Sequence, residues 1–260
     1  MKIITICQKK GGNGKSTSCQ NLAASFAAKG KRVLVVDLDE QGNTSSTMGI
    51  LRKHLTVDAV LAGEEDILFG AALPVWDGEG VCYLGTRGGL SGVMKYLDGE
   101  TGGHLILKER LAVVRGQYDY CFIDTAPSMN ILTLNALCAS DGVFIPLSSK
   151  YFSLKGLVQT MESIEKVQKR LNEKLRVLGM AFVIHDGRSG LASEVIGKVK
   201  EEYGELVFQT IVNQNIRIEE VQVSGRSIIY ADRSDRAAFR GAMRGAAQYE
   251  ALAAELLERL

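Results

Sequence analysis

Short runs of apolar residues recur along the chain, and stretches with helical spacing separate them. Six of these runs are predicted to be strands, at residues 3–7, 32–39, 80–85, 118–125, 142–148 and 175–185. Most of them are nearly continuous in apolar residues, as strands buried on both faces require. The alternation of such strands with helices predicts an α/β fold, with a mostly parallel twisted sheet and helices on both faces.

Two of the intervening stretches carry a clear apolar stripe at helical spacing. The stripe of residues 153–171 is formed by Leu154, Leu157, Val158, Met161, Ile164, Val167 and Leu171. The stripe of residues 235–260 is formed by Phe239, Met243, Ala246, Ala253, Leu256, Leu257 and Leu260. Residues 52–80 are the least regular part, and only a short helix at Val57–Ala62 is expected there. No linker or repeat interrupts the pattern, so we expect one domain over residues 1–260.

Composition narrows the class of protein. The chain has 260 residues, of which 46% are hydrophobic and 23% charged, a balance typical of a globular protein. Its net charge is +1, so binding to nucleic acid would need a local basic patch. Five cysteines are scattered without a CxxC pair, and no signal peptide or 18-residue apolar run is visible. We therefore expect reduced thiols, a cytoplasmic location and no transmembrane segment.

A glycine-rich stretch, KKGGNGKSTS at residues 9–18, stands between the first predicted strand and a predicted helix. Its three glycines allow successive backbone N–H groups to turn toward phosphate oxygens, and the helix N-terminus adds a favourable dipole. They are Gly11, Gly12 and Gly14. The side chains that follow would bind the β- and γ-phosphates, Mg²⁺ and the α-phosphate, in the order Lys15, Ser16 and Thr17.

The front of this loop departs from the common phosphate-binding pattern. GxxxxGK[ST] would need a glycine where Lys9 stands, whereas GGxGK[ST] holds. The loop also begins with Lys10, a lysine that a phosphate cradle by itself does not need. A glycine turn without a ligand is the alternative, and the position between a strand and a helix favours the phosphate site.

Three aspartates follow predicted strands. Asp37 and Asp39 lie at the end of the second strand, and Asp124 lies at the end of the fourth. The carboxyl ends of parallel strands face the ligand crevice of an open sheet, so these carboxylates are expected near the glycine loop. A single aspartate in such a place is often only a helix cap, but three in this order favour a Mg²⁺ and phosphate site.

Four separated motifs carry a family resemblance. They are KGGNGKST at residues 10–17, DLDEQGN at 37–43, YDYCFIDTAPSMNILTLNAL at 118–137 and the segment 215–238. In order and spacing they resemble the ParA/MinD group of P-loop ATPases with a deviant Walker A loop, most closely the Soj-type ParA partition ATPases. The likeness extends over about residues 1–240 and is weakest at 52–115. Asn13 stands where the family has a small aliphatic residue, Ala126 replaces a proline, and the last segment lacks the usual prolines.

The resemblance implies a set of roles at the nucleotide. ATP and Mg²⁺ are the implied cofactors, and Lys10 would cross to the nucleotide of the other subunit in an ATP-sandwich homodimer. Asp39 would orient the attacking water, while Asp37 would help Ser16 and Asp124 to hold Mg²⁺. Residues 41–43 would sense the γ-phosphate, and Asn13 would lie on the γ-phosphate side. The nucleotide contacts implied are Gly11, Gly12, Asn13, Gly14, Lys15, Ser16 and Thr17, with Asn213 and Asn215 for the adenine.

The resemblance also implies partners. With ATP the dimer would bind DNA without sequence preference, and a ParB-like centromere-binding protein would stimulate hydrolysis and release it. This cycle would move a plasmid or chromosome region over the nucleoid, with no membrane involved. Residues 185–260 are slightly more acidic than basic, so only a basic face could bind DNA. The candidates are Arg188, Arg217, Lys198, Arg240 and Arg244.

Four other functions were weighed against this interpretation. A MinD-like membrane ATPase should end in a basic amphipathic helix, whereas YEALAAELLERL holds three glutamates and a stripe that suits packing. A metal-cluster carrier ATPase would need bridging cysteines. A metabolic enzyme such as dethiobiotin synthetase does not fit the DLDEQGN motif. A DNA-binding module without ATPase activity would be excluded by measurable hydrolysis.

Overall fold

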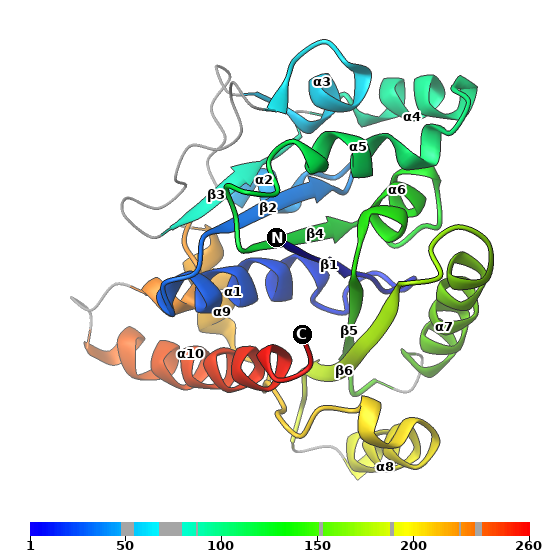
Figure 1. Ribbon diagram of the computed structural model, residues 1–260. Helices are drawn as coiled ribbons and strands as arrows, with labels where there is room; N and C mark the ends of the chain where they lie inside the picture. The colour runs from blue at the N-terminus through cyan, green and yellow to red at the C-terminus, as the bar shows by residue number, and fades with distance from the viewer. Residues whose placement is uncertain are drawn as a thin grey trace.

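The computed structural model describes residues 1–47, 55–67, 80–86, 88–150, 153–187, 190–223, 225–231 and 236–260. A parallel sheet of six strands forms the centre, in the order β3-β2-β4-β1-β5-β6 (Figure 1). The strands are β1 (Lys2–Ile6), β2 (Val33–Leu38), β3 (Val81–Leu84), β4 (Tyr120–Thr125), β5 (Gly142–Ser148) and β6 (Arg176–Ile184). Five lie within a predicted run, and β1 begins one residue before its run, so the α/β fold is confirmed.

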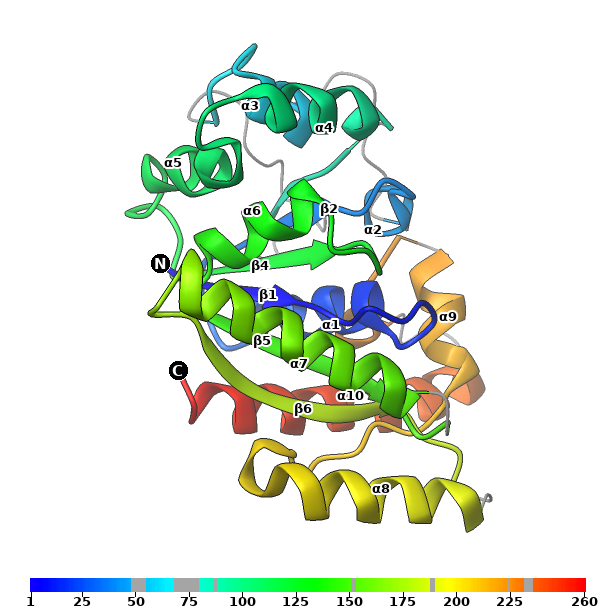
Figure 2. The same ribbon diagram turned by 90° about the vertical axis from the view of Figure 1, so that its right-hand side faces the viewer.

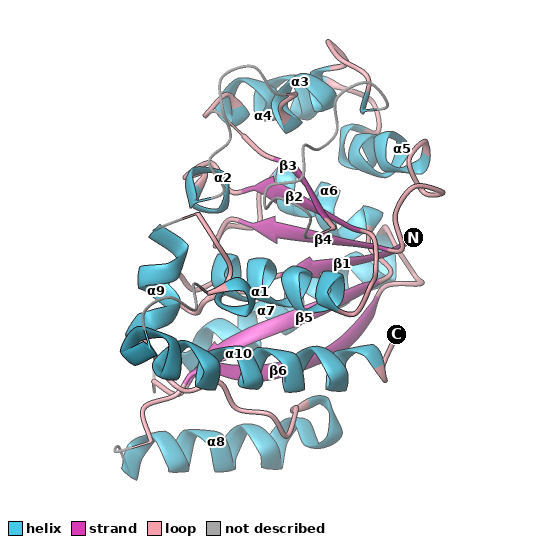
Figure 3. Ribbon diagram, turned by 90° about the vertical axis from the view of Figure 1, so that its left-hand side faces the viewer, coloured by secondary structure: helices cyan, strands magenta, loops and turns pink. Residues whose placement is uncertain are grey.

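Helices cover both faces of the sheet. They are α1 (Lys15–Ala28), α2 (Asn43–Thr47), α3 (Val57–Ala62), α4 (Leu90–Gly99), α5 (Ile106–Ala112), α6 (Ile131–Ala139), α7 (Ser153–Arg170), α8 (Gly190–Tyr203), α9 (Ile216–Val223) and α10 (Arg236–Leu257). Figure 2 looks onto α6 and α7 in front of the sheet, and Figure 3 looks onto α1 and α10 on the other face. The short helix expected at Val57–Ala62 is present as α3.

Strand β2 shows why its sequence is apolar throughout. Val33 and Val35 belong to the core under α1, where Phe26 packs against them. Leu34 and Val36 belong to the core on the opposite face, under α3 to α6. Successive side chains of a strand point to opposite faces, so a strand covered on both sides needs apolar residues at every position.

The apolar stripes of the two long helices are mostly buried, with three errors in the prediction. In α7, Leu157 and Ile164 are in the core, whereas Val158 is 49% exposed and Leu171, just past the helix end, is 38% exposed. In α10, Leu256 is fully buried, whereas Met243 is 54% exposed. Val158 and Met243 each follow a buried residue directly, which turns them about 100° away from the core. The side chain of Phe239 lies outside the described residues.

The register of the sheet brings the predicted site residues to one edge. In the β2–β4 pairing Asp37 is opposite Asp124, and in the β1–β4 pairing Ile6 is opposite Asp124. The loop that leaves β1 therefore begins beside both aspartates. Within the part of the chain that the structure describes, no helix is long and apolar enough to cross a membrane.

Candidate nucleotide site

The glycine loop joins β1 to α1 and exposes backbone donors at its end. Gly12 and Gly14 have φ angles of 73° and 74°, in the left-handed region that favours glycine. Gly14 is the N-cap of α1, and no side chain caps that helix terminus among the described residues. The first N–H groups of α1 are therefore left without a helical partner, which makes the terminus suitable for an anion.

A cleft of about 390 Å³ opens over this loop. Its walls combine the glycine loop and α1 with the segments that follow β2 and β4 and with one residue of α9. The lining residues are Gly11, Gly12, Gly14, Lys15, Ser16, Thr17, Gln20, Asp39, Gln41, Asn43, Pro127 and Gln222. The structure thus brings most of the predicted phosphate-binding residues together with Asp39.

Asp124 is the candidate that best fits a metal ion. Its side chain is fully buried, and its Oδ2 accepts a hydrogen bond of 2.7 Å from the hydroxyl of Thr44. Its Oδ1 has no hydrogen-bond partner among the described residues. Burial, together with the neighbouring Asp37 carboxylate, raises the pKa of Asp124 to about 7. A buried carboxylate oxygen without a donor is costly, and Mg²⁺ is the kind of hard cation that such an oxygen would bind.

The Lys15 ammonium interacts with the carboxylates of both Asp124 and Asp39. It is only 7% exposed, and burial lowers its pKa, while the carboxylates of Asp124 and Asp39 oppose that shift. A phosphate chain in the cleft would favour the charged ammonium in the same way. The geometry is therefore consistent with the predicted contact between Lys15 and the β- and γ-phosphates.

Both carboxylate oxygens of Asp37 accept hydrogen bonds from other residues of the chain. Its Oδ1 accepts from the N–H of Asp39 at 3.0 Å, and its Oδ2 accepts from the N–H and the hydroxyl of Ser45 and from the Tyr83 hydroxyl. The carboxylate is fully buried, and this burial raises its pKa. The structure thus gives Asp37 the task of anchoring α2 to β2, and its predicted contact with Mg²⁺ stays a prediction.

Asp39 lines the cleft, whereas Asp37 is not among the residues that line it. It is 7% exposed, and its Oδ1 accepts a hydrogen bond of 3.0 Å from the N–H of Gln41. This bond fixes the carboxylate beside the glycine loop, on the side of the segment that leads into α2. The position suits the predicted orientation of an attacking water, a role that stays a prediction.

The other two loop residues lie differently from each other. Lys10 is half-buried beside α7, where a Cβ built on Gly156 would come within 3.0 Å of the Lys10 Cβ. The side chain of Asn13 is 1% exposed, and its Oδ1 accepts a hydrogen bond of 3.0 Å from the hydroxyl of Ser148. The amide thus lies against the end of β5, and its predicted place on the γ-phosphate side stays a prediction.

Asn213 and Asn215, the expected adenine contacts, do not line the cleft. The N–H of Asn213 donates to the Gln248 side chain at 3.2 Å. The Asn215 amide donates to the Gly241 carbonyl at 3.0 Å and accepts from the N–H of Arg217, which ties the start of α9 to α10. Both asparagines hold the fold together at this point, and the structure gives no support to the adenine assignment.

Two glutamines that the sequence interpretation missed, Gln20 and Gln222, line the cleft. Gln20 could have been found, because it lies one helical turn beyond Thr17 on α1. Gln222 could not, because it comes from α9, 205 residues away from Thr17, and only the fold brings the two together.

The structure describes the side chains of three of the five predicted DNA-binding residues. Arg217 is paired with Glu220 at 2.5 Å, and Lys198 is paired with Glu194 at 2.7 Å. Arg244 is exposed on α10. Arg188 and the side chain of Arg240 lie outside the described residues. DNA binding by all five therefore stays a prediction.

A larger hollow of about 810 Å³ lies away from this edge, near the start of β6 and the end of α10. Two of its charged groups, Arg259 and Glu255, are already engaged. Arg259 donates to the Leu178 carbonyl at 3.0 Å and lies 4.0 Å from the centre of the Phe208 ring, and the Glu255 carboxylate accepts from the N–H of Gln209. We therefore place the candidate chemistry in the smaller cleft.

Comparison with known proteins supports a nucleotide site in this cleft. Residues 1–177 match the family model described as "AAA domain". The chromosome-partitioning ATPase Soj of Treponema pallidum is 38% identical over 258 residues, which cover 99% of this chain and 98% of that protein. The chromosome partitioning protein ParA of Caulobacter vibrioides is 35% identical, over 89% of this chain and 88% of that protein. The chain belongs to the ParA/Soj family of partition ATPases. The resemblance inferred from the four motifs is thereby confirmed.

A solved structure extends the comparison to the fold. The cobyrinic acid a,c-diamide synthase of Mycobacterium smegmatis, with bound ADP and magnesium, superposes with a TM-score of 0.82 at 27% identity. The match covers 99% of this chain and 94% of that one. The ParA/Soj architecture of this chain is thus shared with an enzyme of another name, so the fold alone does not decide the function.

Proposed function

We propose that this chain is a ParA-type partition ATPase that binds ATP with Mg²⁺ and hydrolyses it to ADP and phosphate. The observation that supports this most is the single cleft that holds an uncapped helix terminus, Lys15 and Asp39, with the unpartnered oxygen of Asp124 buried beside it. Such a set of groups suits a triphosphate, its metal ion and an attacking water. The family relationship makes ATP hydrolysis the natural use of the cleft.

The residues of the cleft would have separate roles in binding and hydrolysing ATP. The free N–H groups of the loop and of α1 would hold the phosphates, and Lys15 would compensate their charge. Ser16 and Asp124 would hold the Mg²⁺, which would neutralise the charge that develops on the phosphates. Asp39 would orient the water, and Lys10 would reach the nucleotide of a second copy of the chain. Hydrolysis would be slow until a ParB-like partner completes the site.

The ATP-bound dimer would then bind DNA through its phosphates and carry a plasmid or chromosome region over the nucleoid in the cytoplasm. DNA binding of this kind needs no base contacts, only cations on one face. The alternative is a MinD-like or other cargo-positioning ATPase of the same group. The carboxyl-terminal helix gives that alternative little support, because Tyr249, Leu252 and Leu256 are buried in the core.

One experiment tests the proposal. The protein is run on gel filtration with Mg²⁺-ATP, with Mg²⁺-ADP and as Asp39→Ala with Mg²⁺-ATP, and the same samples are tested for DNA binding. We expect a dimer that binds DNA only in the presence of ATP. The dimer of Asp39→Ala should be the most stable, because it no longer dissociates after hydrolysis. A protein that hydrolyses ATP but stays monomeric and off DNA in all three samples would contradict the partition function. Vesicle binding that depends on ATP would favour the MinD-like alternative.

A further inference from the structure

Side chains from separate segments line the nucleotide cleft. Asp39, Gln41 and Asn43, which follow β2, are one group of them. Gln20 of α1 and Gln222 of α9 also line the cleft. Figures 2 and 3 show α2 and α9 at the same edge of the sheet as the loop that joins β1 to α1.

The direction of the nucleotide follows from the charged groups. The metal-binding candidate Asp124 is bonded to Thr44 of α2, so the β- and γ-phosphates belong on the α2 side. Thr17, the candidate for the α-phosphate, is bonded instead to Gln222. The nucleoside would therefore leave the phosphate cradle toward Gln20 and Gln222.

The two glutamines form a fixed pair on that side. The Thr17 hydroxyl donates to the Oε1 of Gln222 at 3.3 Å, and the Nε2 of Gln222 donates to the Oε1 of Gln20 at 2.6 Å. Thr17 and Gln20 are three residues apart on α1, so they lie on one face of that helix. Gln222 is 9% exposed. Its amide is thus held in one orientation by contacts at both of its polar atoms.

An amide in a fixed orientation can distinguish purines. Its oxygen and its NH₂ group together accept one hydrogen bond and donate another, which matches the N6 donor and N7 acceptor of adenine. Guanine presents acceptors at both O6 and N7, so an amide cannot satisfy both. A polar group left unpaired in a buried site costs binding free energy.

We propose that Gln222, positioned by Thr17 and Gln20, recognises the base of the bound nucleotide and sets a preference for adenine over guanine. The inference rests on the proposed binding of ATP. It assigns to the Gln20–Gln222 pair the role first expected of Asn213 and Asn215, neither of which lines the cleft.

The test compares the Mg²⁺ complexes of ATP, GTP and inorganic tripolyphosphate in equilibrium binding to the parent protein, Gln222→Leu and Gln222→Glu. The matched control is Gln159→Leu, at an exposed glutamine of α7. We expect the parent to prefer ATP over GTP, and Gln222→Leu to lose roughly 10-fold of that preference, the effect of one bidentate amide–adenine pair. Tripolyphosphate, which has no base, should bind the parent and Gln222→Leu equally. Gln222→Glu, whose charge repels phosphates, should weaken ATP more than Gln222→Leu does.

The outcomes separate this inference from the proposed function. A parent protein that binds neither ATP nor tripolyphosphate contradicts the proposed function itself. A parent that binds ATP, with the same ATP-to-GTP ratio in Gln222→Leu, contradicts only the role of Gln222. Equal losses for ATP and tripolyphosphate would also contradict it, because Gln222 would then act on the phosphate loop. Unchanged thermal unfolding of the variants shows that they fold.

Discussion

Ser45 donates two hydrogen bonds to the same oxygen of Asp37, from its N–H at 2.9 Å and from its hydroxyl at 2.6 Å. The pair connects α2 to the end of β2 across a fully buried carboxylate. The next residue back in α2, Thr44, donates to Asp124 on the neighbouring strand. Consecutive residues of one short helix thus bond both aspartates that stand opposite each other in the sheet, and the position of α2 depends on them.

Ser45→Ala should therefore loosen α2. The change removes one donor from a buried carboxylate, so the free energy of unfolding should fall by about 1–2 kcal/mol. ATP hydrolysis should also fall, because α2 follows the segment that places Asp39 and Gln41 in the cleft. Chemical denaturation and a phosphate-release assay measure the two effects. Ser91→Ala, at an exposed serine of α4, is the control and should stay within about 0.5 kcal/mol of the parent. A Ser45→Ala protein as stable as this control would show that the Asp37–Ser45 contact does not hold α2.

Asp39→Ala should separate nucleotide binding from hydrolysis. The side chain lines the cleft and makes one described contact, to the N–H of Gln41, so its loss should leave the phosphate cradle in place. We expect the rate of ATP hydrolysis to fall by about 100-fold or more, which is the usual contribution of a side chain that accepts a proton from the nucleophile. The affinity for ATP should be retained. Lys15→Ala should instead abolish ATP binding, and Lys10→Ala should retain binding by the monomer but lose the dimer. Parent-like hydrolysis by Asp39→Ala would remove this residue from the catalytic assignment.

The sheet and the phosphate end of the site could be predicted because both depend on local sequence. Strands buried on two faces need apolar residues throughout, as Val33 to Val36 show. Parallel strands end at one edge, which places Asp37 beside Asp124 whatever the length of chain between them. The glycine loop follows the same rule, since it directly continues β1.

The base end of the site could not be predicted, because it depends on contacts between distant segments. Gln222 meets Thr17 only after α9 has packed near α1. Asn215 has a side chain suited to adenine, but it is used to bond the Gly241 carbonyl of α10. The partner of Asn13 could not be predicted either, because Ser148 lies at the end of a strand far along the chain.

Arg217 and Glu220 make a paired test of DNA binding. Their ion pair on α9 is exposed, and in the proposed DNA complex Glu220 would compete with DNA phosphates for the Arg217 guanidinium. Arg217→Glu should weaken ATP-dependent DNA binding and lower the slope of log affinity against log salt by about 1, the effect of one lost phosphate contact. Glu220→Gln should strengthen DNA binding, because it frees the guanidinium and removes a negative charge. Lys198, paired with Glu194 on α8, gives the matched comparison through Lys198→Glu. Unchanged salt titrations for both α9 variants would exclude Arg217 from the DNA surface.

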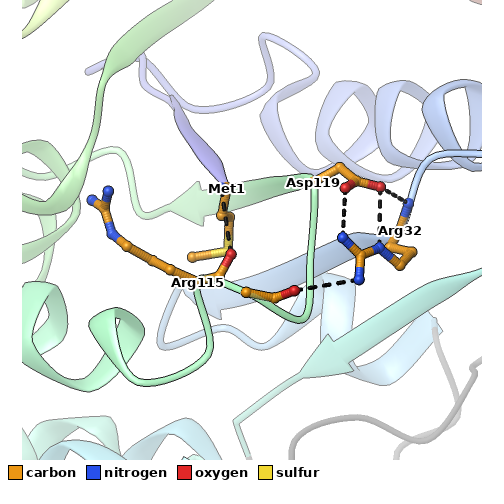
Figure 4. A network of polar contacts seen from close by, with 5 residues as sticks. Met1, Arg32, Arg115 and Asp119 are labelled. Atoms are coloured by element: carbon orange, nitrogen blue, oxygen red, sulfur yellow. Dashed lines mark hydrogen bonds and ion pairs between the residues drawn. The ribbon is translucent and has the colours of Figure 1, made fainter.

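Arg32 and Asp119 lie just before β2 and β4, and they join the two strands by a bidentate contact (Figure 4). The guanidinium donates to both carboxylate oxygens, at 2.7 and 3.3 Å, and the N–H of Arg32 adds a third bond at 2.9 Å. These hydrogen bonds lower the pKa of Asp119 to about 2, below its ordinary value of 3.8. The folded protein therefore holds this proton less tightly than the unfolded chain does. The stabilisation is present above about pH 4, and it is lost as the pH falls toward 2.

Asp119→Asn should accordingly be less stable than the parent at pH 7, and the difference should shrink as the pH is lowered from 4 to 2. Both groups are exposed to solvent, so the effect should be small and should weaken in high salt. Thermal unfolding at a series of pH values measures it. Asp98→Asn, at an exposed aspartate of α4, is the control and should be as stable as the parent at pH 7. A stability difference between Asp119→Asn and the parent that stays constant from pH 7 to pH 2 would mean that the asparagine acts through the backbone contacts of this turn, not through the charge that it removes.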